Sequence, residues 1–254
     1  FAQDGSFLAY GHYQIGSIAV RVLSFSGEDV FDPGFWVNMI SRAKNVRTSV
    51  GLTSVDSRTN CYRLVHGEGD GLPGLIIDYY DGVCVIQAHS VGMFRSKSAI
   101  CEALKTVYGD SLKAVYDKSS GTAPFKAGLN LIDGYLYKAE GFSDDEQIVL
   151  ENGNRFLVNW TEGQKTGFFL DQRENRNLVG RYSRGRNVLN LFCYTGGFSV
   201  YSLASGAAHV DSVDSSGKAM AMVSRNMELN GFEASSHTEY TADAIEFLRS
   251  VPED

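Results

Sequence analysis

The sequence predicts an α/β protein whose C-terminal part is a Rossmann-like sheet of parallel strands, preceded by a small α+β domain. From residue 187 onward, apolar strand-like runs alternate with helical segments of about 10–15 residues, which is typical of βαβ units. Between residues 51 and 146, short strands flank a tight turn and a single long helix. The 254 residues are 43% hydrophobic, enough to bury one large core or two modest ones.

The first segment, residues 1–50, is expected to hold a β-hairpin and a connecting helix. Apolar and polar positions alternate over 7–10 and 18–25, with glycines between the two runs. A short helix is predicted over 35–46, opened by Asp32 as its cap and by Pro33 in its first turn. The segment therefore reads as the end of one small unit and a connector.

The second segment, residues 51–146, is expected to form the α+β domain. A strand over 61–65 precedes two strands, 75–80 and 83–88, joined by Asp81-Gly82, a pair that tolerates the positive φ angles of a two-residue hairpin turn. A helix over 94–107 and a strand over 112–116 follow. Residues 118–146 have weak periodicity and predict a long loop at a domain boundary.

The third segment, residues 147–254, is expected to form the parallel sheet. It begins with a hairpin of strands 148–150 and 155–159 around Asn152-Gly153. The predicted elements then alternate: helix 172–182, strand 187–192, helix 197–205, strand 208–213, helix 216–229, strand 237–241 and helix 243–249.

A glycine turn, Tyr194-Thr195-Gly196-Gly197, follows the first parallel strand, where open α/β sheets bind ligands. The next strand ends at Asp214, whose carboxylate can accept the hydroxyls of a ribose. The turn lacks the GxGxxG pattern that admits a pyrophosphate, which disfavours an NAD-dependent oxidoreductase. S-adenosylmethionine has a ribose and no phosphate, so it fits the pattern; the alternative is a structural turn beside an exposed Asp.

A second concentrated segment is "KTGFFLDQR", residues 165–173. Its polar groups can order a ligand and its aromatic rings can cover an adenine or a methionine chain, while Asp171 can cap the helix that begins near Gln172. The alternative is a helix start with a local apolar patch. Five arginines follow and form either a solvated helix face or a set of phosphate contacts: Arg173, Arg176, Arg181, Arg184 and Arg186.

Composition narrows the remaining classes. The net charge of −7 excludes a chain that is basic throughout, although a local basic face stays open. The four cysteines form no CxxC pair and the five histidines have no metal-ligand spacing, so we expect a reducing cytoplasm and no metal. The sequence has neither an apolar run of about 18 residues nor a signal peptide, and we expect no membrane partner.

"KTGFFLDQR", together with "VLNLFCYTGGFSVYSLASGAAHVDSVDSS" and "NMELNGF", resembles the ribosomal large-subunit RNA methyltransferases that use S-adenosylmethionine, in particular their cytosine-5 branch with an N-terminal PUA domain. The upstream "SFLAYGHY", "SIAVRVLSF" and "YRLVHGEGDGLPGLIIDYYDG" extend the resemblance over most of the chain, least clearly in 118–146. It implies a partial PUA-like RNA-binding barrel in 1–50, a central α+β domain in 51–146 and, in 147–254, the N-terminal half of an incomplete class I methyltransferase domain.

The resemblance also implies which residues hold the cofactor S-adenosylmethionine. The loop before the sheet would contribute Thr166, Phe169, Asp171, Gln172 and Arg173. The methionine part would lie against Asn190, Phe192, Tyr194, Thr195 and Gly196. Asp214 would accept the ribose diol with Ser215 beside the adenine, and Asp243 with Ala244 would lie near the adenine amino group.

The resemblance does not reach a catalytic residue. Enzymes of the cytosine-5 branch add a cysteine thiolate to C6 of the base, and that cysteine lies in a later strand loop that these 254 residues do not match. We interpret Cys193, beside the glycine turn, as a small packing residue. A sheet ending after its third parallel strand exposes an apolar edge, so we expect about 130 further residues in the natural protein, with the catalytic segment beyond Asp254, and no activity without it.

The sequence therefore predicts an RNA methyltransferase acting on ribosomal RNA, with cytosine C5 in the large subunit as the leading target. Two alternatives stay open: methylation of guanine N7 or N2, and a non-catalytic RNA-binding or assembly module that retains the cofactor fold. We allow for a homodimer.

Overall fold

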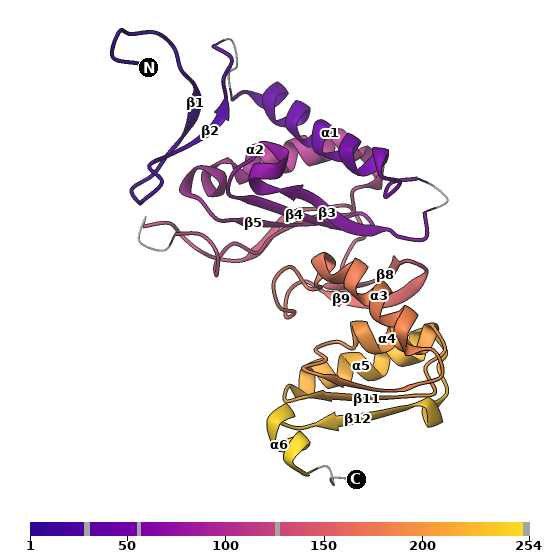
Figure 1. Cartoon of the computed structure of the whole chain (residues 1–254). Coiled ribbons are helices and arrows are strands. Elements are labelled where there is room, and N and C mark those ends of the chain that lie inside the picture. Colours follow the sequence, from indigo (N-terminus) through magenta and orange to yellow (C-terminus); the bar gives the residue numbers. More distant parts are fainter. Residues whose placement is uncertain (28–30, 55–56, 125–127, 251–254) are drawn as a thin grey trace. The chain divides into compact units, whose positions relative to one another are not determined.

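The computed structural model describes residues 1–27, 31–54, 57–124 and 128–250 (Figure 1). The chain forms two compact units. Unit 1 comprises residues 1–147 and 159–168, and unit 2 comprises residues 148–158 and 169–254. None of the helices within the described ranges is long and apolar enough to cross a lipid bilayer.

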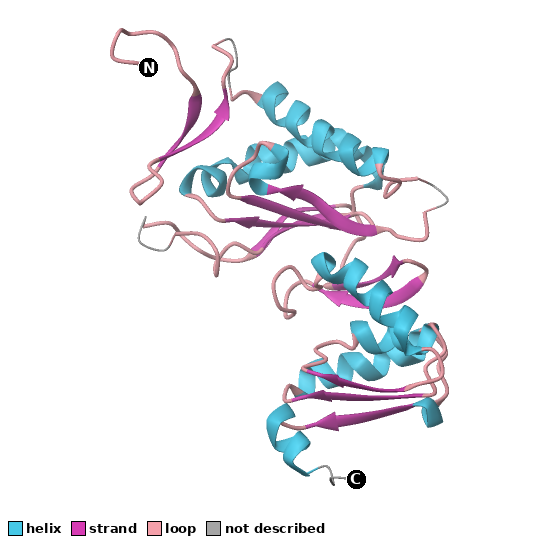
Figure 2. Cartoon of the chain, in the orientation of Figure 1, coloured by secondary structure: helices cyan, strands magenta, loops and turns pink. Residues whose placement is uncertain are grey.

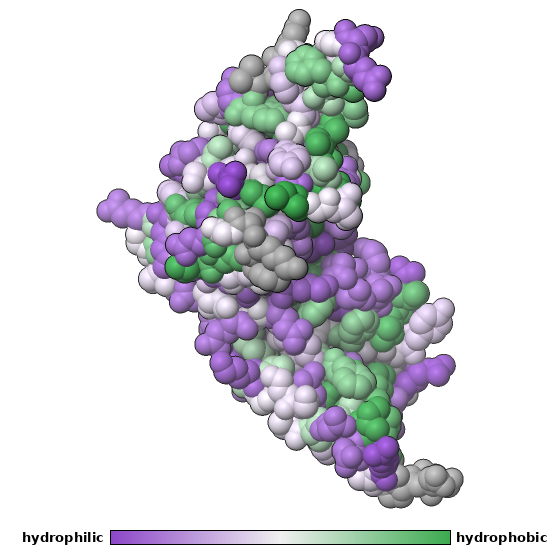
Figure 3. All heavy atoms as spheres, turned by 90° about the vertical axis from the view of Figure 1, so that its left-hand side faces the viewer, coloured by the Kyte–Doolittle hydropathy of each residue, from purple (hydrophilic) through white to green (hydrophobic). Residues whose placement is uncertain are grey.

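Unit 1 begins with the antiparallel pair β1 (Tyr10–Tyr13) and β2 (Val20–Ser24), which confirms the expected hairpin with shorter strands. Large apolar side chains of this segment are exposed: Tyr13, Ile15, Ile18, Val20 and Phe25. Figure 3 shows one face of the molecule, on which apolar side chains lie between polar ones. Exposed apolar groups of this size indicate a surface that packs against something else.

The main sheet of unit 1 has the order β3-β4-β5-β6-β7. Its strands are β3 (Cys61–His66), β4 (Leu75–Tyr80), β5 (Val83–Ala88), β6 (Ala114–Asp117) and β7 (Gly134–Lys138). Only the β5–β6 pair is parallel. Helices α1 (Pro33–Ser49) and α2 (Val91–Tyr108) cover one face (Figure 2). Between them and the sheet lies an apolar core that includes Trp36, Ile40, Leu64, Ile77, Ile86 and Leu104.

Local signals in the sequence set several boundaries of unit 1. Asp32 caps α1, because its Oδ1 accepts a hydrogen bond from Phe35 N at 2.8 Å, and Pro33 occupies the first turn. Asp81 and Gly82 have φ angles of 45° and 97°, the left-handed conformations that a two-residue turn between twisted antiparallel strands requires. Both features were predicted from the sequence.

The region 118–146, predicted as a long loop, contains strand β7, which pairs antiparallel with β6 at the sheet edge. The prediction missed it because four of its five residues are half-buried, so that apolar and polar positions do not alternate. The structure also returns residues 159–168 to unit 1. There Trp160 is fully buried, and Lys118 Nζ donates a hydrogen bond to its carbonyl oxygen at 2.6 Å.

Unit 2 contains a hairpin and a three-stranded parallel sheet of order β10-β11-β12. The hairpin strands are β8 (Glu146–Glu151), which starts in unit 1, and β9 (Asn154–Asn159), and the parallel strands are β10 (Asn187–Leu191), β11 (His209–Asp214) and β12 (His237–Thr241). The helices are α3 (Arg173–Ser183), α4 (Gly197–Ala204), α5 (Gly217–Leu229) and α6 (Ala244–Ser250). Helices α4 and α5 lie on the same face of this sheet (Figure 1). The alternation of strands and helices matches the prediction.

A buried ion pair joins the hairpin of unit 2 to α3. Arg176 Nε and Nη2 donate to the two carboxylate oxygens of Glu151, both at 2.8 Å, and Tyr201 donates to Glu151 Oε1 at 3.0 Å. The side chains of Arg176 and Glu151 are 3% and 0% exposed. Arg176 therefore belongs to the interior, whereas Arg181, Arg184 and Arg186 are exposed.

Replacing Arg176 by Leu should lower the free energy of unfolding of unit 2 by about 3–5 kcal/mol, because Glu151 would stay buried without its cationic partner. Urea unfolding followed by far-ultraviolet circular dichroism measures the change. Trp36 and Trp160, the two tryptophans, both belong to unit 1, so their fluorescence reports that unit separately.

Arg249→Leu serves as the matched control. Arg249 pairs with Glu246 at 3.4 Å, and both side chains are exposed, so its loss should change the free energy of unfolding by less than about 1 kcal/mol. Equal effects of the two substitutions would contradict a stabilising role for the buried pair.

Candidate functional site

Asp214 connects the three loops at the carboxyl edge of the parallel sheet. Its carboxylate accepts hydrogen bonds from Tyr194 N, in the loop after β10, and from Ser216 N, in the loop after β11, each at 2.9 Å. Its carbonyl oxygen accepts from Ala242 N, in the loop after β12, at 3.1 Å. The structure thus brings together the predicted turn and the predicted acid at the edge where parallel sheets bind ligands.

The turn itself has an unusual backbone. Phe192, Tyr194 and Gly196 have φ angles of 56°, 50° and 77°. Left-handed conformations are uncommon for bulky residues, and they occur at functional sites where surrounding contacts hold them. At Gly196 a side chain would also be crowded, because a Cβ atom would lie 3.2 Å from Val223 Cγ1. The left-handed conformation of the glycine turn therefore depends on the contacts that surround it.

Phe169 connects the "KTGFFLDQR" segment to this turn. Its ring packs edge-on against Tyr194, with ring centroids 5.3 Å apart and planes at 83°. Arg176 Nη1 donates to the Phe169 carbonyl oxygen at 3.0 Å, which ties the segment to α3. Two aromatic rings thus meet beside the backbone that the sequence assigned to the cofactor.

The next three predicted residues lie at the start of α3. Asp171 and Gln172 belong to a 3-10 turn, and Arg173 pairs with Glu174 at 3.0 Å. The N-cap of α3 is Gln172, and Asp171 Oδ2 accepts a hydrogen bond from Gln172 Nε2 at 3.0 Å. Asp171 is therefore not the cap of α3, because the 3-10 turn starts the helix one residue later than the sequence suggested.

Thr166 belongs to unit 1. Its hydroxyl is fully buried, donates to Asp78 Oδ2 at 2.6 Å and lies 2.9 Å from the hydroxyl of Tyr80. Asp78 in turn pairs with Arg63, with Nε and Oδ1 2.9 Å apart. The structure commits this hydroxyl to an internal network, and a cofactor role for Thr166 stays a prediction.

The remaining predicted residues lie near the ends of β11 and β12. Ser215 is exposed and follows Asp214. Asp243 Oδ1 accepts from Ile245 N and Glu246 N, at 2.9 and 3.0 Å, and so supports the first turn of α6. Ala244 is buried. Asp243 therefore has a structural role at the position where the adenine was expected.

Asn226, which the sequence did not assign to the site, supports the turn through hydrogen bonds of its side chain. Its Nδ2 donates to the Thr195 carbonyl oxygen at 2.8 Å, and its Oδ1 accepts from Leu157 N in β9 at 2.8 Å. One helical turn later, Asn230 Oδ1 accepts from Arg155 N at 2.9 Å. The asparagines of "NMELNGF", four residues apart in the last turn of α5 and at its C-cap, were the available signal.

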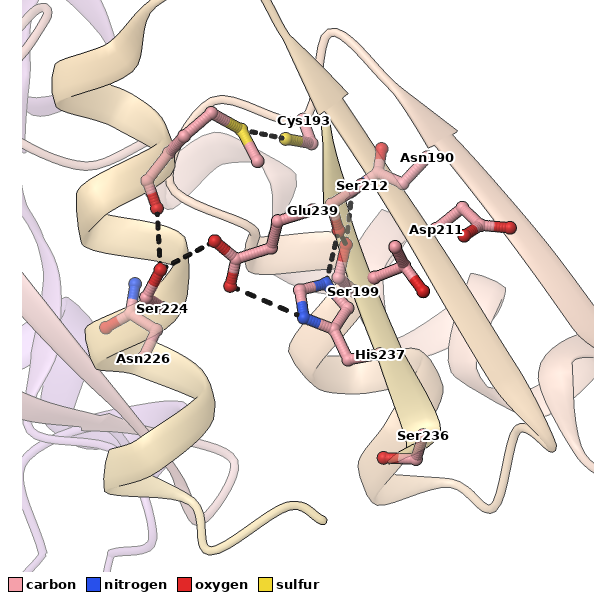
Figure 4. A network of polar contacts seen from close by, with 12 residues as sticks. Asn190, Cys193, Ser199, Asp211, Ser212, Ser224, Asn226, Ser236, His237 and Glu239 are labelled. Atoms are coloured by element: carbon pink, nitrogen blue, oxygen red, sulfur yellow. Dashed lines mark hydrogen bonds and ion pairs between the residues drawn. The ribbon is translucent and has the colours of Figure 1, made fainter. Parts of the chain in front are cut away.

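A chain of polar contacts runs from Asn190 through the interface between the sheet and its helices (Figure 4). Asn190 Nδ2 donates to Ser199 Oγ at 2.8 Å, and the Ser199 hydroxyl lies 2.7 Å from that of Ser212. The Ser212 hydroxyl is 2.8 Å from His237 Nε2. His237 Nδ1 lies 3.6 Å from Glu239 Oε1. The sequence pointed to Asn190 alone, because its partners come from other elements.

The residues present fit a ligand that carries a ribose. The Asp214 carboxylate accepts two backbone hydrogen bonds and retains further lone pairs for hydroxyl groups. The hydroxyl oxygen of Thr195 is buried, and no partner for it exists among the described residues. An orphan hydroxyl beside a left-handed turn provides a polar group that a bound ligand can satisfy.

The cysteine beside the turn is poorly suited to nucleophilic chemistry. Cys193 is 5% exposed, its sulfur lies 3.6 Å from Met220 Sδ, and burial raises the pKa of its thiol to about 12. The thiol is therefore protonated at neutral pH. Within the described ranges, no group of three or more His, Cys, Asp or Glu residues is arranged to hold a metal ion.

Comparisons with known proteins point to one family. Residues 136–244 match the S-adenosylmethionine-dependent methyltransferase family. The whole chain is 38% identical to Ribosomal RNA large subunit methyltransferase I of Aeromonas hydrophila and spans 62% of that protein's length. A protein of the same name from Pseudoalteromonas atlantica is 37% identical over 98% of the chain, which spans 61% of its length.

Solved structures similar to this chain are also described as methyltransferases. A proposed SAM-dependent methyltransferase from Streptococcus mutans superposes with a TM-score of 0.81 at 25% identity, covering 97% of this chain and 62% of its own. A second proposed methyltransferase, solved in complex with SAH, has a TM-score of 0.77 at 25% identity and covers 91% of this chain and 57% of its own.

His237 should make the stability of unit 2 depend on pH. Burial lowers the pKa of its imidazole from 6.5, against an opposing contribution from Glu239. Below pH 6.5 the unfolded state takes up the proton more readily than the folded state, so stability present above pH 6.5 is lost as the pH falls toward the folded-state pKa. Urea unfolding of unit 2 between pH 8 and 5, followed by circular dichroism, should show this loss.

His237→Gln should flatten that dependence for unit 2 and leave the pH dependence of unit 1, read from tryptophan fluorescence, unchanged. The same slope in the variant and the natural sequence would contradict the assignment to His237.

Proposed function

We propose, from the match of residues 136–244 to the S-adenosylmethionine-dependent methyltransferase family, that the protein transfers a methyl group from S-adenosylmethionine to large-subunit ribosomal RNA. Unit 2 has the Rossmann-like fold of class I methyltransferases. The observation that carries the proposal is the Asp214 carboxylate, bonded to Tyr194 N and Ser216 N beside a left-handed glycine turn.

In this proposal, the cofactor lies across the carboxyl ends of β10, β11 and β12. Asp214 accepts the ribose hydroxyls, and the backbone of Thr195 and Gly196 approaches the methionine part. Phe169 and Tyr194 supply aromatic surface, and their contact supports this placement. The bound cofactor would supply an electrophilic methyl group, and these residues would orient it toward the acceptor.

For the acceptor, we propose large-subunit RNA, on the names of the relatives, and within it cytosine C5, on the resemblance to the cytosine-5 branch alone. All four cysteines of residues 1–254 are buried: Cys61, Cys84, Cys101 and Cys193. Burial raises the pKa of three of these thiols, Cys84, Cys101 and Cys193. We therefore assign no nucleophile for C6 to any of them.

We also propose that the β1–β2 hairpin belongs to a PUA-like RNA-binding barrel. The exposed apolar side chains of this segment support the proposal, since strands of a barrel bury one face against a partner layer. A base inside folded RNA must be single-stranded or flipped out to reach the cofactor, which requires contacts to the RNA outside the methyl-transfer site.

Asp214→Ala should weaken the binding of S-adenosylhomocysteine about 10- to 100-fold, because it removes a charged acceptor of two ribose hydroxyls. Isothermal titration calorimetry measures the dissociation constant. Asp211→Ala, on the same strand, is the matched control and should bind like the natural sequence. Equal affinities for the Asp214 variant and the control would contradict the ribose contact.

The activity itself is tested by incubating the full-length protein, including the expected catalytic segment, with labelled S-adenosylmethionine and undermodified ribosomal RNA, and by mapping the product by mass spectrometry. Methyl incorporation at cytosine C5 of large-subunit RNA is the expected result. A product methylated at guanine N7 or N2 would contradict cytosine C5 as the target atom. An absence of S-adenosylhomocysteine binding would contradict the assignment of the cofactor.

A further inference from the structure

Unit 1 contains a cavity of about 720 Å³, which is within the range of ligand pockets in proteins. All of its lining residues belong to unit 1, whereas Asp214 and the glycine turn belong to unit 2. Four cationic and two acidic side chains line it: Arg21, Arg63, Lys118, Lys165, Glu68 and Asp133. An excess of cations stands out in a chain of net charge −7.

Hydrogen bonds or solvent reach the two carboxylates that line the cavity, without removing their charge. Asp133 accepts hydrogen bonds from Ser120 N and Ser120 Oγ, both at 2.8 Å. Glu68 is exposed, so solvent screens its carboxylate. Arg63 is paired with the buried Asp78 and adds no net charge. Arg21 and Lys118 supply positive charge beside these carboxylates.

Arg21 and Lys118 differ in their hydrogen-bond partners. Lys118 Nζ donates to the Trp160 carbonyl oxygen at 2.6 Å, which fixes its position without neutralising its charge. The Nη1 atom of Arg21 is buried, and the described residues offer it no hydrogen-bond partner. A buried guanidinium nitrogen without an acceptor is costly, and phosphate oxygens match guanidinium geometry well.

We propose that this cavity binds a backbone phosphate of single-stranded RNA, with Arg21 as the principal donor and Lys118 as a supporting charge. The proposal rests on the proposed function in one respect, namely that the substrate is RNA. Among the described residues, no Phe, Tyr or Trp lines the cavity, so it offers no stacking platform for a base. It would fix the register of the RNA without reading its sequence.

The first test measures the binding of a fluorescently labelled single-stranded RNA of about 12 nucleotides by anisotropy at several salt concentrations, using the full chain. Arg21→Gln should raise the dissociation constant about tenfold and reduce the salt slope by about one. Arg21→Lys should retain most of the affinity. Arg95→Gln, an exposed arginine of α2 outside the cavity, is the matched control and should bind within twofold of the natural sequence.

The second test adds a charge at the cavity without touching Arg21. Gly121 lines the cavity, and a Cβ atom there would meet nothing within 4 Å, so longer side chains fit. Gly121→Glu should weaken RNA binding several-fold more than Gly121→Gln, which has the same shape without the charge. This pair keeps the proposal testable if Arg21→Gln fails to fold.

Three results would overturn the proposal: no RNA binding by the natural sequence, unchanged affinity in both Arg21→Gln and Gly121→Glu, or competition by free uridine monophosphate as strong as by RNA. S-adenosylhomocysteine binding, measured on the same samples, separates this outcome from failure of the proposed function. If the variants bind S-adenosylhomocysteine normally and their RNA affinity is unchanged, the phosphate site in the cavity is rejected and the proposed function is not.

Discussion

The hydrogen bonds of Asp214 are the constraint on which the candidate site depends. Parallel strands place their carboxyl ends at one edge, but the loops that follow are long enough to adopt many conformations. Asp214 removes that freedom, because its carboxylate holds the backbone of Tyr194 and Ser216 and its carbonyl oxygen holds Ala242. The same carboxylate retains acceptor capacity, so the group that builds the site can also face the ligand.

The support of the turn is polar where an interior is usually apolar. Asn226 bonds to Thr195 and Leu157, and Ser199 and Ser212 link Asn190 to His237. Apolar packing would fill the same space without specifying orientation, whereas hydrogen bonds fix the direction of each group. Hydrogen bonds therefore suit this site, where the Asn190 amide and the glycine turn would meet a ligand at fixed positions.

Much of the fold follows from local sequence, and the exceptions have a common cause. The turns Asp81-Gly82 and Asn152-Gly153 and the cap at Asp32 were predictable because neighbouring residues determine φ angles and caps. Strand β7 was not, since its half-buried positions lack alternation. In the candidate site, Tyr194 and Asp214 could be paired from the order of parallel strands. The hydroxyl of Thr166 could not be assigned, because its partner Asp78 lies 88 residues away.

The left-handed backbone at Phe192 and Tyr194 is the feature of the site that local sequence explains least. Bulky residues adopt this conformation at a cost of about 1–3 kcal/mol each, so the fold must hold them there. Asp214 does so at the Tyr194 amide, and Asn226 does so at the Thr195 carbonyl one residue later. Because Gly196 could adopt its φ angle without such help, the strain of the turn rests on the two aromatic residues. The turn held in this way places the ring of Tyr194 against that of Phe169, so the strained backbone lies where the candidate site has its aromatic surface.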